Sequence, residues 1–267
     1  MTIAYAAVLF DLEGTLYEAG RAVPGAVDAV AKVRSAGLAV RYVTNTTRAP
    51  RAALATRLSG MGFEVREGEL FTAVSAAAEW CRGEGLRTVL PLLRDEAVAD
   101  LEGLTVVGVD AVSTATEAPP AAVVVGDLGE AWTYGALNTA FRCLAAGARL
   151  VACQKNRAWQ EADGLSLDAG PFVAALEYAA LQEAVVVGKP SPIFFRAAIA
   201  GLAVDPRTVV VVGDDAEVDA GGAIEAGLSG WLVRSGKYRP GDESRSAPWP
   251  ECVLRSIAEL PAALKIE

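Results

Sequence analysis

The sequence predicts an α/β fold: a Rossmann-like three-layer core with a parallel sheet, interrupted by an inserted second α/β domain. Segments rich in Val, Leu and Ile alternate with longer Ala-rich stretches, which is the pattern of successive βα units. Four short polar motifs follow apolar segments, and open parallel sheets place their ligands at the carboxyl ends of strands. Two motifs precede residue 46 and two follow residue 188, so a long interval separates the pairs.

The expected elements follow from hydrophobic runs and from helix start signals. The predicted strands run over residues 5–10, 38–43, 87–92, 105–109, 121–125, 149–152, 184–187, 208–212 and 230–233. The predicted helices cover residues 24–35, 50–59, 69–82, 130–146, 171–181, 192–200 and 216–226. Pro24, Pro50 and Pro171 suit first-turn positions, where a missing N–H costs nothing.

The interval between the two pairs of motifs carries its own alternation of strands and helices. That pattern favours an inserted domain over a long loop. Gly83 and Gly85, together with residues 181–183, mark the expected crossings. The predicted domains are therefore a core of residues 1–82 and 183–267 and an inserted domain of residues 83–182.

Composition excludes several classes of protein. A hydrophobic fraction of 52% is ample for a buried core, yet no apolar stretch reaches the roughly 18 residues that span a bilayer. The N-terminus has no basic segment ahead of a hydrophobic region, so we expect a mature cytoplasmic protein without a membrane partner. A net charge of -9 argues against a nucleic-acid partner.

The chain has no histidine and four widely spaced cysteines. The lack of histidine removes every Ser-His and Cys-His catalytic arrangement and the usual histidine-bearing zinc sites. The cysteines form no Cys-x-x-Cys pair, so buried reduced thiols are expected. Carboxylates, lysine and hydroxyl groups must therefore carry any chemistry.

The first motif, Asp11-Leu12-Glu13-Gly14-Thr15, lies directly behind an apolar run. In an extended strand end, residues i and i+2 point to one side, so Asp11 and Glu13 would share the ligand side. An ordinary turn with solvated acids is the alternative, since Asp and Gly are common turn formers.

The second and third motifs offer donors for an anion. Thr44 and Asn45 could present hydroxyl and amide groups to a phosphate, with a helix near Pro50 adding its positive end. Helix capping is the alternative for Thr47. Lys189 lies in a short loop at a strand end, although most such lysines are simply solvated.

The fourth motif is acidic. Asp214 and Asp215 follow an apolar strand, and Asp219 lies near the first turn of the next helix. Helix capping explains one or two of these acids. If the acids converge with Asp11 and Glu13, their repulsion calls for a cation, and oxygen ligands favour Mg²⁺. The ordered set predicts metal-assisted phosphoryl transfer through an aspartyl-phosphate.

These motifs resemble the haloacid dehalogenase superfamily of phosphatases, and the insertion resembles its C2-type cap. The segments that carry the resemblance are Asp11–Thr15, Val43–Thr47, Gly170–Tyr178, Val187–Pro192, Val212–Asp215 and Val233–Pro240. The likeness spans nearly the whole chain. The motifs are similar to those of a branch that includes phosphatases of phosphoramidates and pyrophosphate.

The resemblance implies a nucleophile and a metal site. Asp11 would be the nucleophile, and its second oxygen, the backbone carbonyl of Glu13 and Asp214 would bind Mg²⁺. Asp215 and Asp219 would not bind the metal directly, and they would orient water molecules or Lys189 next to the metal ligands.

The resemblance also implies a substrate site. Thr44, Asn45 and Lys189 would hold the phosphoryl oxygens. The segment of the cap that faces the site in such enzymes contains Lys155, Asn156, Arg157 and Trp159. A basic loop residue and a partly exposed tryptophan are the alternative interpretation of Arg157 and Trp159.

One residue departs from the superfamily pattern. Its efficient phosphatases carry Asp two residues after the nucleophile, as general acid and base, and this chain has Glu13. Acid–base help is worth about 10²–10⁴-fold, and a shift of about 1 Å can cost about 10²-fold. Glu13 keeps the chemistry but adds a methylene, so we expect a working enzyme whose turnover the longer side chain can slow.

The sequence thus predicts a Mg²⁺-dependent phosphatase acting on a small phosphorylated compound, with phosphoramidates and pyrophosphate among the candidates. One rival is a catalytically weak, metal-binding regulatory protein on the same fold. A second rival is carbon–halogen hydrolysis by Asp11, which the late acidic cluster disfavours. The physiological substrate depends on the shape of the cap. Relatives with this cap often form homodimers through it, so a homodimer through the cap is a candidate here, and the sequence leaves the oligomeric state open.

Overall fold

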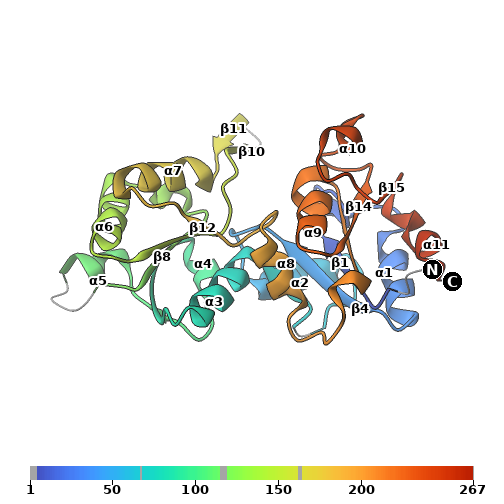
Figure 1. The fold of residues 1–267 in the computed structure, drawn as a ribbon, viewed down its shortest axis with the longest axis horizontal. Coiled ribbons are helices and arrows are strands. Elements are labelled where there is room, and N and C mark those ends of the chain that lie inside the picture. The colour runs from blue at the N-terminus through green and yellow to red at the C-terminus, as the bar shows by residue number, and fades with distance from the viewer. Residues whose placement is uncertain (1–4, 67, 115–118, 162–163, 267) are drawn as a thin grey trace. The chain divides into compact units, whose positions relative to one another are not determined.

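The computed structural model describes residues 5–66, 68–114, 119–161 and 164–266, and the chain forms two compact units (Figure 1). Unit 1 comprises the residues up to 44, residues 52–71 and the residues from 189 onward. Unit 2 comprises residues 45–51 and 72–188.

The main sheet of unit 1 has six strands in the order β15-β14-β13-β1-β4-β5. They are β1 (Ala7–Asp11), β4 (Ala39–Thr44), β5 (Leu70–Thr72), β13 (Val209–Gly213), β14 (Ser229–Val233) and β15 (Cys252–Leu254). A two-stranded ribbon is formed by β2 (Tyr17–Glu18) and β3 (Arg21–Ala22). The helices are α1 (Ala26–Ser35), α2 (Arg51–Gly60), α8 (Pro192–Ile199), η2 (Pro206–Thr208), η3 (Ala216–Gly221), α9 (Gly222–Glu225), α10 (Asp242–Arg245), η4 (Ile257–Glu259) and α11 (Leu260–Leu264).

The strand order of this sheet reverses its direction between β1 and β13. From β1 the chain winds to β4, and from β13 it winds the opposite way to β14 and β15. Because crossovers between parallel strands are right-handed, the helices of the two halves cover opposite faces. The predicted Rossmann-like fold with a parallel sheet is confirmed, and its topological switch point lies between β1 and β13.

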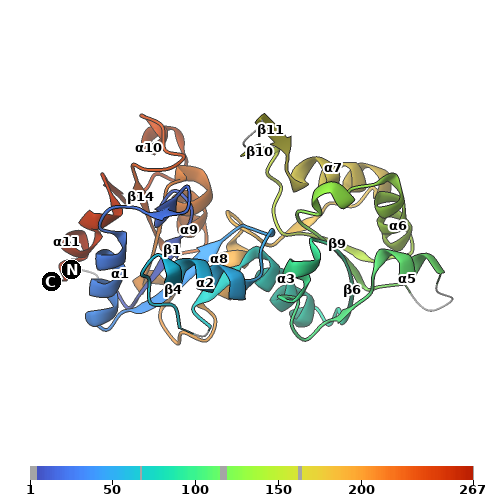
Figure 2. The ribbon, with the colours of Figure 1, turned by 180° about the vertical axis from the view of Figure 1, so that it is seen from behind.

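The central strands are apolar because both of their faces are covered. Residues Ala7 to Phe10 of β1 and Val209 to Val212 of β13 are fully buried and lie in parallel register. On the helices, α1 packs beside η4 and α11, and α8 packs beside α9 (Figures 1 and 2).

Unit 2 holds a five-stranded sheet in the order β12-β9-β8-β6-β7. Its strands are β6 (Thr88–Leu92), β7 (Thr105–Val106), β8 (Ala122–Val125), β9 (Arg149–Ala152) and β12 (Val185–Val186), and β10 (Ala158–Glu161) and β11 (Gly164–Leu167) form an antiparallel pair. Its helices are α3 (Ala73–Gly83), α4 (Asp95–Val98), α5 (Val109–Thr114), η1 (Gly129–Ala131), α6 (Tyr134–Ala145) and α7 (Ala169–Ala180).

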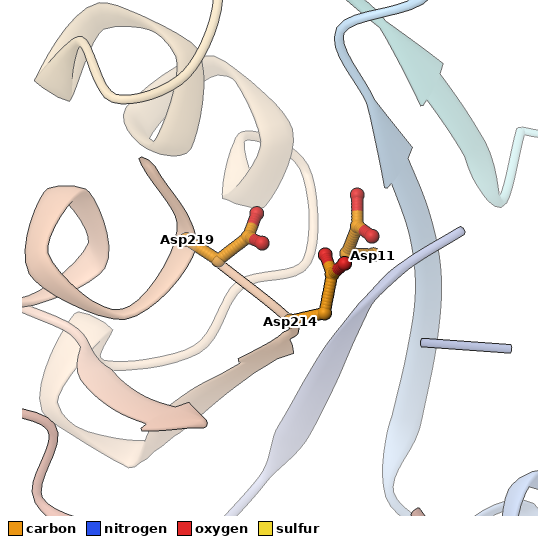
Figure 3. A group of neighbouring side chains, drawn as sticks. All are labelled: Asp11, Asp214 and Asp219. Atoms are coloured by element: carbon orange, nitrogen blue, oxygen red, sulfur yellow. The ribbon is translucent and has the colours of Figure 1, made fainter. Parts of the chain in front are cut away.

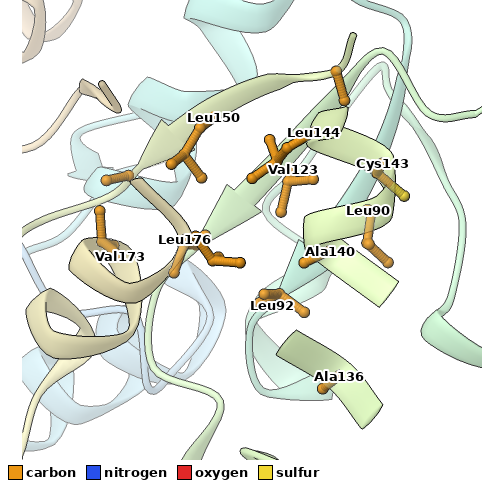
Figure 4. Packing of buried hydrophobic residues seen from close by; sticks show 13 residues of the cluster. Leu90, Leu92, Val123, Ala136, Ala140, Cys143, Leu144, Leu150, Val173 and Leu176 are labelled. Atoms are coloured by element: carbon orange, nitrogen blue, oxygen red, sulfur yellow. The ribbon is translucent and has the colours of Figure 1, made fainter. Parts of the chain in front are cut away.

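The core of unit 2 is built from alternate strand residues and helix stripes (Figure 4). On β8, Val123 and Val125 point to one face, as the period of a strand requires. Helix α6 covers that face with residues spaced three and four apart, among them Ala136, Ala140 and Cys143. This packing gives unit 2 a hydrophobic core of its own.

The boundaries of the two units differ from the predicted ones. Residues 45–51, 72–82 and 183–188 fall in unit 2, whereas the predicted insertion spans residues 83–182. The reason at the second boundary is that Val185 and Val186 form β12, which pairs with β9 of the unit 2 sheet. The return to unit 1 therefore comes only after Gly188.

Several local predictions differ from the structure. The predicted helix 69–82 begins only at Ala73, because Leu70–Thr72 forms β5 and the Thr72 side chain caps the helix by accepting from the N–H of Ser75. The predicted strand 105–109 ends at Val106. The predicted helix 216–226 begins as a π-helical turn, η3, before it becomes α9.

Candidate active site

Three carboxylates meet at the switch point of the unit 1 sheet (Figure 3). Asp11 ends β1, Asp214 directly follows β13, and Asp219 comes from η3. Each offers a carboxylate oxygen within 4.8 Å of the others, and all three residues are buried. The neighbouring strands β1 and β13 run parallel, so their carboxyl ends bring Asp11 and Asp214 together.

One buried lysine joins this cluster. The ammonium of Lys189 donates to Asp11 Oδ1 and to Asp219 Oδ1, each at 2.6 Å, and the residue is 4% exposed. Three carboxylates around one ammonium leave an excess of negative charge when all are ionised. Buried charge of one sign is costly, so the cluster calls for an additional cation or for bound protons.

The pKa values show the same imbalance. Burial, outweighing the attraction of Lys189, raises the pKa of Asp11 to about 6. Burial and repulsion by Asp11 and Asp219 raise the pKa of Asp214 to about 7. For Lys189, burial lowers the pKa but the two carboxylates outweigh it, so its pKa lies above the ordinary value. Lys189 is therefore held as a cation.

Two glycines make room for the carboxylate of Asp214. Gly14 has φ +91° and Gly236 has φ +57°, in the left-handed region that side chains disfavour. A Cβ at either position would lie 2.1 Å from Asp214 Oδ2. The backbone N–H of Lys237 donates to this oxygen at 2.6 Å, and the Ser235 hydroxyl donates to the carbonyl of Gly14 at 2.7 Å. These contacts fix Asp214 from two loops that are far apart in the sequence.

The π-helical turn η3 places the other acids. The backbone N–H of Asp215 donates to Asp219 Oδ2 at 3.2 Å, and a Cβ at Gly213 would lie 2.2 Å from the Asp219 carboxylate. The Asp215 carboxylate accepts from the N–H groups of Glu217 and Val218, so it caps η3. Asp219 therefore contacts Lys189 within the carboxylate cluster, whereas Asp215 shapes the turn.

The remaining unit 1 residues of the prediction lie around Asp11. The Thr15 hydroxyl donates to Asp11 Oδ2 at 3.3 Å. Asp11 pairs with Val43 in register, so Thr44 is the next residue along the adjacent strand, and it is buried. Glu13 is exposed, two residues beyond Asp11 in the chain.

The other predicted substrate residues belong to unit 2. Asn45 approaches Gly188 so closely that a Cβ there would lie 2.7 Å from the Asn45 side-chain oxygen. Arg157 is exposed on the segment before β10, and Trp159 lies within β10. The Arg48 guanidinium carbon lies 3.7 Å from the Trp159 ring centroid. The substrate roles of Asn45, Arg157 and Trp159 stay predictions.

The nearby Lys155 is already engaged. Its ammonium donates to both carboxylate oxygens of Glu177, at 2.9 and 2.8 Å. This pair ties the segment to α7, so Lys155 has a structural partner within unit 2.

The donors of the cluster fit Mg²⁺. They are hard carboxylate oxygens with neither nitrogen nor sulfur, from residues that lie close together and carry more negative charge than Lys189 balances. The residues present therefore match a magnesium site better than a zinc or copper site.

Sequence reasoning missed the loop Ser235-Gly236-Lys237, which holds Asp214. The segment Val233–Pro240 is part of the family resemblance, but the sequence analysis assigns no structural or catalytic role to it. Its position directly after an apolar strand was an available signal, since β14 lies beside β13 and ends at the same edge.

Among the described residues, no helix is both long and apolar enough to cross a membrane. The cysteines Cys81, Cys143 and Cys153 are buried and Cys252 is half-buried, all as free thiols.

Family models match two parts of the chain. A model described as haloacid dehalogenase-like hydrolase matches residues 8–106, and a HAD-hydrolase-like model matches residues 186–260.

Similar proteins and structures cover nearly the whole chain. Human haloacid dehalogenase-like hydrolase domain-containing protein 2 is 42% identical over 95% of this chain and 93% of its own length. Human phospholysine phosphohistidine inorganic pyrophosphate phosphatase is 38% identical over 94% and 91%. The p-nitrophenyl phosphatase from Archaeoglobus fulgidus superposes with a TM-score of 0.87 at 26% identity, covering 97% and 99%. A glycerol phosphate phosphatase from Mycobacterium tuberculosis, solved in complex with magnesium, gives 0.84 at 27%, covering 96% and 76%. This chain therefore belongs to the haloacid dehalogenase-like hydrolase family and is an enzyme whose relatives include phosphatases.

Proposed function

We propose that this enzyme is a Mg²⁺-dependent phosphatase that hydrolyses a small phosphorylated compound through an aspartyl-phosphate on Asp11. The observation that carries this proposal is the buried cluster of Asp11, Asp214 and Asp219 around Lys189 at the switch point. A carboxylate nucleophile, a fixed cation and an uncompensated negative charge are the parts that such chemistry needs.

In the first step, an oxygen of Asp11 attacks phosphorus and the bond from phosphorus to the leaving group breaks. Glu13 donates a proton to the leaving group, which departs with the electron pair of that bond. In the second step, Glu13 takes a proton from water, whose oxygen attacks phosphorus. The bond between phosphorus and Asp11 then breaks, releasing phosphate and regenerating the carboxylate. Lys189 keeps Asp11 oriented and balances negative charge throughout.

The residues that would hold Mg²⁺ are Asp11, Asp214 and the backbone carbonyl of Glu13, with Asp215 and Asp219 behind them. When bound, the ion neutralises and polarises the phosphoryl oxygens. This assignment is supported by the oxygen-only cluster and by a magnesium-bound structural neighbour.

The proposal also assigns the residues that bind the substrate. Thr44, Asn45 and Lys189 hold the phosphoryl oxygens, while Arg157 and Trp159 of unit 2 select the leaving group. Unit 1 is then the catalytic core and unit 2 the cap. A relative named for phospholysine, phosphohistidine and pyrophosphate makes phosphoramidates and pyrophosphate the first candidates to test. A homodimer through unit 2, a cytoplasmic location and the lack of nucleic-acid or membrane partners stay predictions.

Asp11→Asn tests the nucleophile. The substitution keeps the shape of the side chain but removes the anionic oxygen, so hydrolysis of p-nitrophenyl phosphate should fall to the background rate. Circular dichroism should show an unchanged fold. Hydrolysis near the wild-type rate, in a preparation shown free of contaminating phosphatase, would refute the mechanism. A folded wild-type protein that binds Mg²⁺ yet hydrolyses no phosphorylated metabolite in a broad screen would instead favour the regulatory alternative.

A further inference from the structure

A second cation, Lys237, lies beside the candidate metal site and has no role in the mechanism above. Its backbone N–H holds Asp214, and the loop is pinned further by the Gly236 N–H, which donates to Glu18 Oε1 at 2.7 Å. Most surface lysines are anchored only by a flexible stem, but here the Cα is fixed at the site. The Lys237 ammonium is exposed and, within the described part of the chain, has no hydrogen bond or ion pair.

The charge of Lys237 acts on the cluster. Although burial dominates the pKa values of Asp11 and Asp214, the Lys237 ammonium lowers both of them.

Lys237 also lines a pocket of about 250 Å³ that has Asp214 in its wall. Its other lining residues are Asp215, Ala216, Glu217, Asp242, Arg245 and Ser246. Two of the charged groups are already paired with each other, because Arg245 forms an ion pair with Asp242 at 3.3 Å.

The unengaged groups of the pocket decide what it can bind. Asp215 is occupied as a helix cap, so Lys237 and the exposed Glu217 are the charges without a partner among the described residues. An anion could therefore be held by the ammonium of Lys237, with Glu217 opposing it.

We propose that Lys237 is a specificity-determining residue, which favours phosphorylated substrates whose leaving group carries a second negative charge. The inference rests on the proposed phosphatase function, because it places the phosphoryl group at Asp11 and Asp214. A leaving group that extends from that position into the pocket meets a fixed ammonium. A neutral leaving group gains nothing from it.

A matched pair of ligands tests this selectivity. Glycerol 3-phosphate and 3-phosphoglycerate share a three-carbon skeleton, and the second carries a carboxylate where the first has a hydroxymethyl group. Their dissociation constants are measured by calorimetry on the full chain with excess Mg²⁺ at low salt. The wild type should bind 3-phosphoglycerate more tightly than glycerol 3-phosphate. Lys237→Gln should shrink that ratio by roughly 2- to 5-fold, the scale of one exposed ion pair.

Two further variants keep the test specific. Glu217→Gln removes the opposing charge and should increase the ratio by roughly 2-fold. Lys32→Gln removes an exposed lysine on α1 and should leave the ratio unchanged. Raising the salt concentration should reduce the wild-type preference, since screening weakens exposed charge pairs.

Three results would overturn the inference: equal wild-type affinity for the two ligands, no binding of either ligand, or an unchanged ratio in Lys237→Gln. Turnover of p-nitrophenyl phosphate on the same preparations reports separately on the proposed function. If the protein hydrolyses this ester but does not prefer the ligand with the carboxylate, only the inference about Lys237 is refuted. If the protein prefers 3-phosphoglycerate but does not hydrolyse p-nitrophenyl phosphate, only the proposed phosphatase function is refuted.

Discussion

The two sheets share a topology but carry opposite kinds of polar cluster at their switch points. In unit 1 the strand order reverses between β1 and β13, and in unit 2 it reverses between β6 and β8. The first switch point holds Asp11 and Asp214, buried and in charge excess. The second holds Arg94 and Asp127, whose backbones are joined by a 2.9 Å hydrogen bond and whose side chains form an ion pair at 3.4 Å.

The second cluster is solvated where the first is buried, and its excess charge is positive, because two arginines face one carboxylate. Asp127 also pairs with Arg48 at 2.5 Å, and the two arginine side chains are each 35% exposed. Half-exposed charges remain solvated by water, so no bound ligand is needed to stabilise them. The difference teaches that strand topology brings polar residues together at both switch points. Whether such a group needs a bound cation depends on its burial and on the sign of its excess charge.

The largest expected effect comes from removing the cation of each cluster. Lys189→Met leaves buried carboxylates without their ammonium and should lower the free energy of unfolding by about 3–5 kcal/mol. Arg94→Met, the matched change at the second switch point, should cost about 0–1 kcal/mol because its pair is half-exposed. Urea unfolding at pH 8 in chelator measures both. Similar costs for the two variants would erase the distinction between the clusters.

The next effect is on the pH dependence of stability. The folded-state pKa values of Asp11 and Asp214, about 6 and about 7, lie above the ordinary value of 3.8. Between pH 4 and 7 the folded state therefore binds more protons than the unfolded state, and stability falls as pH rises through this window. The loss should be a few kcal/mol in metal-free protein, since one pKa unit is worth about 1.4 kcal/mol.

Melting temperatures at pH 5.5 and pH 8, with chelator and with Mg²⁺, check this expectation. Mg²⁺ should restore stability mainly at pH 8, where the carboxylates are ionised. Asp214→Asn removes one titrating group and should flatten the profile in chelator. A wild-type profile in chelator that falls with rising pH no more steeply than that of Asp214→Asn would contradict the charge imbalance.

The sequence predicted most of the first region because its signals are local. Each motif directly follows an apolar run, and the order of the runs places Asp11, Lys189 and Asp214 at one edge of a parallel sheet. In unit 2 as well, the predicted strand 149–152 has the bounds of β9. Local patterns sufficed where a strand is buried on both faces.

The sequence could not predict what depends on tertiary approach. The contact of Gly14 with Gly236 joins loops from opposite ends of the chain, and neither loop reveals its partner. The strand pair β10–β11 was not predicted because its apolar side chains are exposed, and Leu165, for example, is 78% exposed. An exposed strand does not require the alternation of apolar and polar residues that identifies a half-buried strand. The pairing of Asp127 with Arg48 and Arg94 was missed because such residues ordinarily lie in solvent.

A smaller effect is expected from Gly236→Ala. The Cβ would meet Asp214 Oδ2 at 2.1 Å and the Cα of Gly14 at 2.5 Å, so the carboxylate must move. We expect at least a roughly 10-fold loss of Mg²⁺ affinity in calorimetry and about 1–2 kcal/mol of lost stability. Gly37→Ala is the control, since Gly37 has φ +83° but nothing within 4 Å. Gly37→Ala should lose stability through backbone strain alone and should keep the wild-type Mg²⁺ affinity. Equal Mg²⁺ affinity in the two variants would mean that Asp214 is not held by this packing.

The smallest effect is expected at the second switch point, from Arg48→Lys. The variant keeps the positive charge near Asp127 but loses the planar group that lies 3.7 Å from the Trp159 ring. A stacked cation at a half-exposed site is worth about 0.5–1 kcal/mol, so unfolding in urea should shift by no more than that. Trp159 should become more accessible, with emission moved to longer wavelength and stronger quenching by acrylamide. Trp159→Phe identifies its share of the signal among the other tryptophans. A loss above about 2 kcal/mol would show that this cluster is as critical as the buried one, and the contrast between the two switch points would fail.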